Sequence, residues 1–201
     1  MSVNIELNSK EINIIVCFYV LKMLERRKLI NNFDKTYQLI EGDINQKAII
    51  EFKLNNDTKC SIYMINGKLT SITQGTPLDD YLSNNLDIHK IVILKEPAKK
   101  VIKQIQSEYK NAEFFREHEM LEDMSSKVFT PDHQYLNEDE KNELLEKFNA
   151  NELSEMNEHE PQARYYNAKV GDIFRIIRPS LSSGTSIFYR RVAHGPIDPF
   201  C

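Results

Sequence analysis

Hydrophobic side chains in the first quarter of the chain follow the spacing of one helix and a pair of strands. After Ser9, the predicted helix cap, apolar residues over 12–24 recur at steps of three and four, as in an amphipathic helix. The runs 48–54 and 60–65 are rich in β-branched and aromatic residues and flank four polar residues typical of a turn. These two runs therefore predict a β-hairpin.

The next stretch alternates between helical and strand patterns. A short helix is predicted near 79–86, and the apolar run 90–94 predicts a buried strand. Pro97 is then expected to open a helix that buries one face over 101–109, and 112–115 predicts the following strand. Strand, helix and strand in this order predict an α/β layer.

The pattern changes near residue 124, where we place a domain boundary. Asn137 and Glu140 have the spacing of a capping box, so they predict the start of a helix that continues to Phe148. The acidic stretch 152–160 follows, and we interpret it as a solvated face or a connector.

The end of the chain predicts a small two-stranded module. The expected elements are a helical turn opened by Pro161, a turn at 170–172, a strand over 173–178 that Pro179 ends, a loop over 180–186 and a strand over 187–192. The sequence therefore predicts an α/β domain over 1–123, followed by a small α+β domain over 124–201.

Charge is distributed unevenly along a chain of ordinary globular composition, with 41% hydrophobic and 28% charged residues. The net charge of −4 combines −1 for residues 1–123, −7 for 124–160 and +4 for 161–201. Nucleic-acid-binding proteins usually carry a dominating basic face, so any contact with DNA is expected to be local. The basic cluster 26–28 ends the first predicted helix, and we interpret it as a complement to the helix dipole.

Cysteine, histidine and hydropathy patterns indicate no cofactor, metal or membrane segment. The cysteines Cys17, Cys60 and Cys201 are far apart, and none of the five histidines forms a ligand pair with a cysteine. The longest apolar run, 14–21, is too short to cross a bilayer and lacks the flanks of a signal peptide. We therefore expect an intracellular protein in a reducing compartment.

Two functions other than assembly are compatible with parts of the sequence. Asp43, Glu51 and Lys53 resemble the Asp and Glu-x-Lys set of restriction-type nucleases, in which carboxylates hold Mg²⁺ and the lysine orients or activates water. Glu51 and Lys53 would also share the solvent face of a half-buried strand, which needs no catalytic explanation. The basic C-terminal strands could alternatively form a free DNA-binding module.

Short motifs near the C-terminus carry the most specific information. In order they are Glu160-Pro161-Gln162-Ala163-Arg164-Tyr165-Tyr166, Gly171-Asp172, Arg175-Ile176-Ile177-Arg178-Pro179-Ser180, Gly184 and Tyr189-Arg190. In type and spacing these motifs resemble the fifth subunit of eukaryotic RNA polymerases and its shorter archaeal counterpart. Thr130-Pro131-Asp132-His133 and the capped helix resemble the segment that precedes them in that family.

The resemblance implies a structural role. The family's C-terminal module docks on the largest polymerase subunit, and the N-terminal jaw of its eukaryotic members lies beside downstream DNA, with no catalytic group of its own. Residues 1–123 would then be the jaw-like domain and 124–201 the assembly domain. A member with both domains is of the eukaryotic or large-DNA-virus kind, located in the nucleus if cellular and in the host cytoplasm or virion if viral.

The same resemblance implies a set of partner-binding residues. They are Pro131, His133, Pro161, Arg164, Tyr165, Tyr166, Gly171, Arg178, Pro179, Ser180, Gly184, Tyr189 and Arg190. As alternatives, the tyrosines could fill the module's own core, and Arg178 could bond to Asp172 or to the acidic stretch. Asn167 replaces a frequent family glycine but can adopt a left-handed conformation. Leu181 stands where the family carries an acidic residue.

Overall fold

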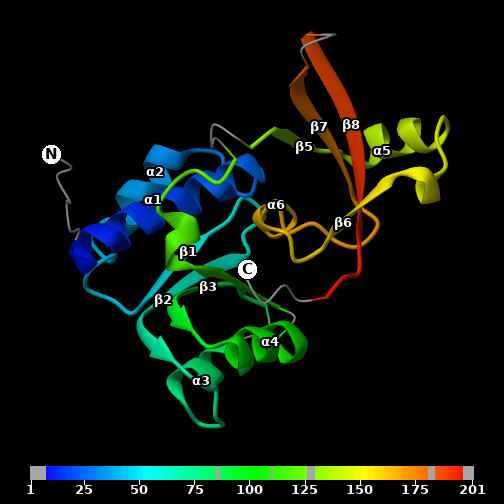
Figure 1. Ribbon diagram of the computed structural model, residues 1–201. Coiled ribbons are helices and arrows are strands. Elements are labelled where there is room, and N and C mark those ends of the chain that lie inside the picture. The colour runs from blue at the N-terminus through cyan, green and yellow to red at the C-terminus, as the bar shows by residue number, and fades with distance from the viewer. Residues whose placement is uncertain (1–7, 85–86, 110, 126–129, 181–183, 197–201) are drawn as a thin grey trace, which may run out of the picture. The chain divides into compact units, whose positions relative to one another are not determined.

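The chain folds into two units, each built on one four-stranded sheet, in the computed structural model of Figure 1. The structure describes residues 8–84, 87–109, 111–125, 130–180 and 184–196. The units are Met1–Glu122 and Asp123–Cys201. Both contain helices and strands, so the fold is mixed α+β.

Three parallel strands and one antiparallel strand form the sheet of the N-terminal unit. The strands are β1 (Ile49–Lys53), β2 (Lys59–Leu69), β3 (His89–Pro97) and β4 (Ala112–Arg116), in the spatial order β1-β2-β3-β4. The predicted hairpin is confirmed, because β1 and β2 pair antiparallel with Ile50 opposite Ile62. β2, β3 and β4 are parallel, as the strand, helix and strand order predicted.

The helices of this unit are α1 (Ser9–Arg26), α2 (Phe33–Ile40), α3 (Pro77–Ser83), α4 (Lys99–Glu108) and the 3-10 helix η1 (Glu117–Met120). Asn8, and not Ser9, caps α1. Its side chain accepts a hydrogen bond from the backbone amide of Glu11 at 2.9 Å, and the Glu11 carboxylate accepts one from the backbone amide of Asn8 at 2.9 Å. Ser9 is therefore the first helical residue. The end of the helix predicted over 79–86 falls on residues outside the described ranges.

Prolines set two boundaries in this unit. Pro77 opens α3 behind the cap residue Thr76, two residues before the predicted start. Pro97 does not open a helix as predicted, because it is the last residue of β3 and pairs with Leu69. The amide of Ala98 donates to the Leu69 carbonyl at 2.8 Å, so the chain stays on the sheet until α4 begins.

The sequence predicted that Arg27 complements the dipole of α1. In the structure Arg27 also makes a buried ion pair. Its guanidinium donates to both carboxylate oxygens of Glu113 on β4 at 2.8 Å, and His89 lies 2.9 Å from the same carboxylate. The side chains of Arg27 and Glu113 are only 5% and 14% exposed. Burial alone raises the pKa of Glu113, but the charge of Arg27 and the hydrogen bond from His89 lower it to about 2.

The sheet of the C-terminal unit has the order β5-β7-β8-β6. Its strands are β5 (Asp132–Tyr135), β6 (Ser154–Asn157), β7 (Ile173–Ser180) and β8 (Gly184–Ala193), and its helices are α5 (Glu138–Leu145), the 3-10 helix η2 (Ala150–Glu152) and α6 (Pro161–Tyr165). β7 and β8 form an antiparallel hairpin, β5 pairs antiparallel with β7, and β6 pairs parallel with β8. The predicted capping box of α5 is confirmed at Asn137 and Glu140.

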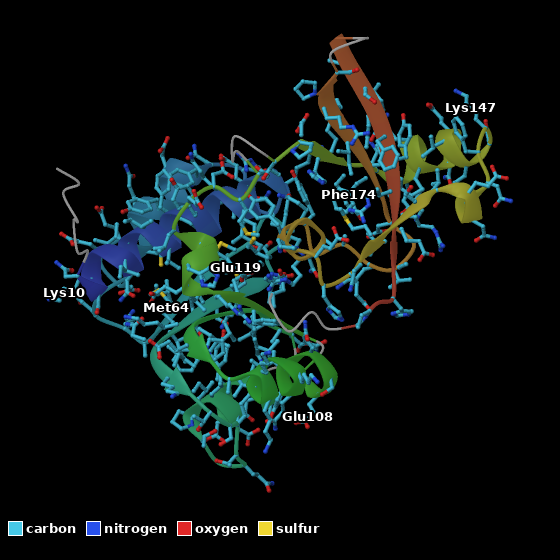
Figure 2. All side chains as sticks on the ribbon, viewed as in Figure 1. Lys10, Met64, Glu108, Glu119, Lys147 and Phe174 are labelled. Atoms are coloured by element: carbon cyan, nitrogen blue, oxygen red, sulfur yellow. The ribbon has the colours of Figure 1, made fainter. Side chains whose placement is uncertain are left out.

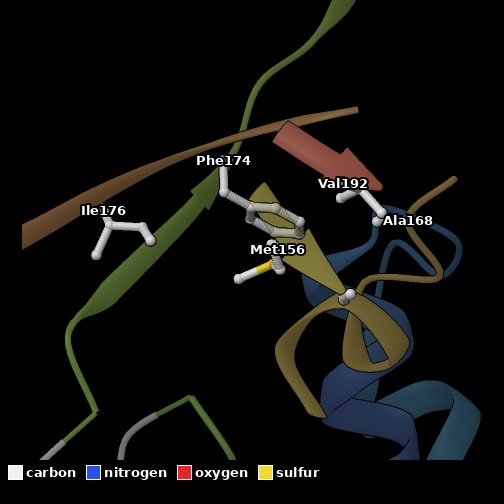
Figure 3. Close-up of a cluster of buried hydrophobic side chains, with 6 residues drawn as sticks. Met156, Ala168, Phe174, Ile176 and Val192 are labelled. Carbon is white, nitrogen blue, oxygen red and sulfur yellow. The ribbon is translucent and has the colours of Figure 1, made fainter. Parts of the chain in front are cut away.

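Two apolar clusters hold this sheet to its helices. Figure 3 shows the larger one, in which Phe174, Ile176 and Val192 of the hairpin meet Met156 of β6 and Ala168, and which also includes Ala163 of α6. The second cluster joins Ile173 on the opposite face to Leu136 and to Leu144 of α5. Both faces of the sheet are therefore covered where the four strands overlap.

Two predictions for this unit need correction. The acidic stretch is more than a solvated face or connector, because it contains the strand β6, which pairs with residues 190–193 of β8. Pro179 does not end β7, because it stays in register opposite Thr185 and the strand continues to Ser180. A proline is tolerated there because no described strand pairs with the other side of β7 at this point.

No helix in the described part of the chain is both long and apolar enough to span a bilayer.

Candidate assembly interface

The tyrosine pair is positioned by α6, which Pro161 opens at a position where no amide donor is needed. Tyr165 is 2% exposed and belongs to the interior of the unit. Tyr166 is half-buried, and its ring stacks on that of Tyr135 with centroids 6.3 Å apart. The alternative that these tyrosines fill the unit's own core therefore holds for Tyr165 and in part for Tyr166.

The turn before β7 has a rigid hydrogen-bonded geometry. Asn167 and Gly171 adopt left-handed conformations, with φ of 50° and 95°. The Asp172 carboxylate accepts hydrogen bonds from the backbone amide of Lys169 at 2.6 Å and from the hydroxyl of Tyr135 at 3.0 Å. Burial, followed by the charge of Asp172, raises the pKa of Tyr135 to about 12. Gly171 thus has a local role in shaping this turn.

Arg190 is fully engaged inside the C-terminal unit. Its guanidinium forms a fork with the two carboxylate oxygens of Glu160 at 3.0 and 3.1 Å. It also donates to the backbone carbonyl of Glu155 at 3.0 and 2.6 Å. These contacts tie β8 to β6 and to the start of α6, so Arg190 stabilises the sheet.

Three other predicted residues lie on β5, α6 and β8, and one of them contacts Phe174, which is labelled in Figure 2. His133 on β5 lies edge-on to the Phe174 ring at 6.3 Å, and its Nδ1 is 2.7 Å from the carbonyl oxygen of Pro131. Arg164 is half-buried in the last turn of α6. Tyr189 is half-buried on the opposite face, where it packs against the cluster of Ile173.

Arg178 differs from the other arginines of the hairpin because its side chain is exposed. Its guanidinium lies 5.5 Å from the ring centroid of Phe188 on the neighbouring strand. Among the described residues it forms no ion pair with Asp172 or with the acidic stretch. Asp172, Glu155 and Glu160 pair with other cations. The alternative of an internal salt bridge for Arg178 therefore finds no support.

The far end of the β7–β8 hairpin gathers the remaining predicted residues. Pro179 and Ser180 end β7, and Gly184, with φ of 73°, begins β8 opposite Ser180. Beside them Ile187 is 57% exposed and Phe188 39% exposed. These two residues were not singled out in the sequence, because an apolar strand run predicts burial and does not show which of its residues a helix covers.

The thirteen predicted residues thus separate into three groups. Arg178, Pro179, Ser180 and Gly184 lie at the far end of the hairpin. Tyr165, Gly171 and Arg190 have roles within the unit. The others, Pro131, His133, Pro161, Arg164, Tyr166 and Tyr189, lie around the sheet and α6.

The nuclease alternative gains nothing from the geometry. Asp43 follows α2 and pairs with Lys47 at 2.8 Å. Glu51 and Lys53 lie on the exposed side of β1, while Ile50 and Phe52, which alternate with them along the strand, are buried. Within the described residues, no group of three or more histidine, cysteine, aspartate or glutamate side chains is arranged to hold a metal ion.

Comparison with known proteins matches the sequence to one family. The family described as RNA polymerase Rpb5, C-terminal domain, matches residues 122–192. DNA-directed RNA polymerase subunit 5 of Acanthamoeba polyphaga mimivirus is 30% identical over 194 residues, which cover 92% of this chain and 93% of the relative. A Dictyostelium discoideum subunit of RNA polymerases I, II and III is 26% identical over 85% of this chain and 92% of its own length.

An archaeal relative is matched over a smaller part of the chain. DNA-directed RNA polymerase subunit Rpo5 of Archaeoglobus fulgidus is 37% identical over 67 residues, which are 88% of that protein but 32% of this chain. All three relatives are, by name, subunits of DNA-directed RNA polymerases. The chain belongs to the RNA polymerase subunit 5 family, and the resemblance in its C-terminal motifs is confirmed.

Proposed function

We propose that this chain is a non-catalytic subunit of a multisubunit DNA-dependent RNA polymerase and that its C-terminal unit docks on the largest subunit. Family membership carries the proposal, because the mimivirus relative is a polymerase subunit by name and matches 92% of the chain. The other polymerase subunits are then its partners. A cellular polymerase would place the chain in the nucleus, and a viral one in the host cytoplasm or virion.

The far end of the β7–β8 hairpin supports docking through the C-terminal unit. Arg178 and Phe188 are residue types favoured at the centres of protein interfaces, and Ile187 adds exposed apolar area beside them. Arg190 and Tyr165, in contrast, already use their polar groups or their surface within the unit. We therefore assign docking to the far end of the hairpin before the other predicted residues.

We further propose that the N-terminal unit forms part of the lower jaw near downstream DNA. The mimivirus and Dictyostelium relatives match most of the chain, whereas the archaeal relative aligns with about a third of it, so a polymerase subunit of this family can exist without a comparable N-terminal unit. A net charge of −1 over residues 1–123 argues for a few local contacts with DNA instead of a broad basic surface.

Domain mapping tests this assignment. The fragments Met1–Glu122 and Asp123–Cys201 are expressed separately with the largest subunit of the same polymerase, and each is used to capture it. We expect capture by the C-terminal fragment. Capture by the N-terminal fragment alone would show that the docking surface is misassigned. For the jaw, downstream DNA carrying a photo-crosslinker should label the N-terminal unit in a transcribing complex, and labelling of other subunits only would contradict that role.

The proposed absence of catalysis has its own test. The isolated protein is expected to show no nucleic-acid cleavage, nucleotidyl transfer or ATP hydrolysis with Mg²⁺, because the sequence has no phosphate-binding glycine loop. The Asp43→Ala variant should behave identically. Magnesium-dependent cleavage that disappears in this variant would restore the nuclease alternative.

A further inference from the structure

The β7–β8 hairpin extends beyond both edge strands of its sheet (Figure 1). On one side β5 pairs with residues 174–177 of β7, and on the other side β6 pairs with residues 190–193 of β8. Before Arg190, no strand in the described part of the chain pairs with the outer edge of β8. At Ile187 the outer edge of β8 therefore has no neighbouring strand among the described residues.

Backbone hydrogen bonds determine which residues face that edge. The amide of Val192 donates to the carbonyl of Asp172 at 2.7 Å, so the backbone groups of Val192 point toward β7. In an antiparallel ladder this direction alternates from residue to residue. Phe188 therefore also points its backbone groups toward β7, whereas Ile187 points its amide and carbonyl outward.

The opposite edge of the hairpin is blocked by a proline. Leu136 donates its amide to the carbonyl of Ile173 at 3.1 Å, so the backbone of Ile173 faces the β5 side of β7. Pro179 is six residues further along the strand and has the same orientation, but it has no amide to offer there. The hairpin thus has one edge closed to strand addition and one edge open, at Ile187.

Side chains near the open edge indicate the chemistry of an added strand. Ile187 is 57% exposed and lies directly opposite Ile177, so an apolar side chain beside it would become buried. On the other face the Arg178 guanidinium leans across the strand to within 5.5 Å of the Phe188 ring centroid. Neighbouring strands lie about 4.8 Å apart, so a carboxylate on an added strand could reach this guanidinium.

We infer that an extended, acidic segment of another polymerase subunit adds as a strand to the outer edge of β8 at Ile187. Backbone hydrogen bonds to Ile187 provide the pairing, an apolar side chain covers Ile187, and an aspartate or glutamate pairs with Arg178. This inference rests on the proposed function and specifies how the docking is made. β6 already pairs with the same edge further along, so the added strand extends an existing side of the sheet.

Hydrogen–deuterium exchange tests the inference on the unaltered protein. Exchange of the Ile187 amide is measured at single-residue resolution in the free subunit and in the assembled polymerase. The amide of Phe188, which points toward β7, is the internal reference. We expect the Ile187 amide to exchange faster than that of Phe188 in the free subunit and to slow by about tenfold or more on assembly, with a smaller change at Phe188.

Two substitutions at one position separate backbone pairing from side-chain contact. Ile187→Ala removes most of the apolar side chain but keeps the amide, whereas Ile187→Pro replaces the side chain with a small ring, removes the amide donor and leaves the ladder to β7 intact. We expect the proline variant to enter polymerase about tenfold less than the alanine variant when each competes with the unaltered subunit. The melting temperature of each free variant checks that the hairpin still folds.

The outcomes distinguish the inference from the proposed function. If the subunit is present in polymerase and the Ile187 amide exchanges as fast as in the free protein, the strand addition is wrong and the polymerase role stands. If the subunit is absent from polymerase, the proposed function fails. Protection that rises with the concentration of the free subunit, together with a dimer in sedimentation, would identify a second copy as the occupant and overturn the inference. If the proline variant does not fold, the exchange experiment decides.

Discussion

Replacing Arg178 should weaken assembly while leaving the free protein nearly unchanged. The side chain is exposed, and its contact among the described residues is the Phe188 ring at 5.5 Å. An exposed cation–π contact contributes about 0.5–1 kcal/mol, so Arg178→Ala should lower the stability of the free subunit by no more than that.

The effect on the complex should be much larger. If a carboxylate of the partner meets the guanidinium away from water, truncating the arginine costs about 2–5 kcal/mol of binding, or roughly 30-fold to several-thousand-fold in affinity. Most of this loss is the penalty for leaving the partner's carboxylate unpaired. Arg178→Lys should recover only part of the affinity, because an ammonium group cannot form the two-pronged contact of a guanidinium.

The assay compares the melting temperature of each free variant with its recovery in polymerase purified from cells. Arg175→Ala is the matched control on the same strand, because the Arg175 guanidinium makes its ion pair within the unit, with a carboxylate oxygen of Glu140 at 3.7 Å. We expect Arg175→Ala to affect the melting temperature more than assembly, and Arg178→Ala to do the reverse. Normal recovery of Arg178→Ala combined with a lowered melting temperature would remove Arg178 from the interface and refute this reasoning.

Three further predictions concern the two units separately. A chain without residues 1–122 should still enter polymerase, as co-purification will show, and its exclusion would mean that the N-terminal unit contributes to docking. Arg190→Ala should lower the unfolding free energy by about 1–2 kcal/mol in urea titrations, because it breaks the half-exposed pair with Glu160, whereas unchanged stability would mean that the pair contributes nothing. Glu113→Ala should cost about 3–5 kcal/mol, because it removes the buried carboxylate that pairs with the Arg27 guanidinium. Because the folded pKa of Glu113 is lowered from 4.5 to about 2, its contribution should be present above pH 4.5 and be lost as the pH falls toward 2. The Glu113→Gln variant should lack this pH-dependent part of the stability. An acid-unfolding profile identical to that of the unaltered protein would contradict the assignment.

Local patterns predicted much of the fold because they report interactions between near neighbours. The capping box at Asn137 and Glu140 closes within one turn, and the hairpin over 48–65 follows from two strand runs around a polar turn. The same reasoning misplaced the cap of α1 by one residue, because Asn8 and Ser9 are both good caps and only the backbone geometry selects between them.

Contacts between distant parts of the chain were out of reach of such patterns. Glu155 in the acidic stretch belongs to a strand because residues 190–193 lie beside it, and no local signal announces that pairing. Glu160 meets Arg190 across 30 residues, which converts a predicted interface arginine into an internal tie. The exposure of Ile187 likewise depends on how far α5 and β6 extend along the hairpin. The apolar run of β8 does not reveal this.

Purification under native conditions tests the central claim most directly. The chain, tagged at its endogenous level and isolated with nucleic acid digested, should co-elute in equal amounts with the two very large chains of a DNA-dependent RNA polymerase. The purified assembly should synthesise RNA on a DNA template. Elution of the tagged chain alone, or with partners that do not include those two large chains, would contradict its assignment as a polymerase subunit.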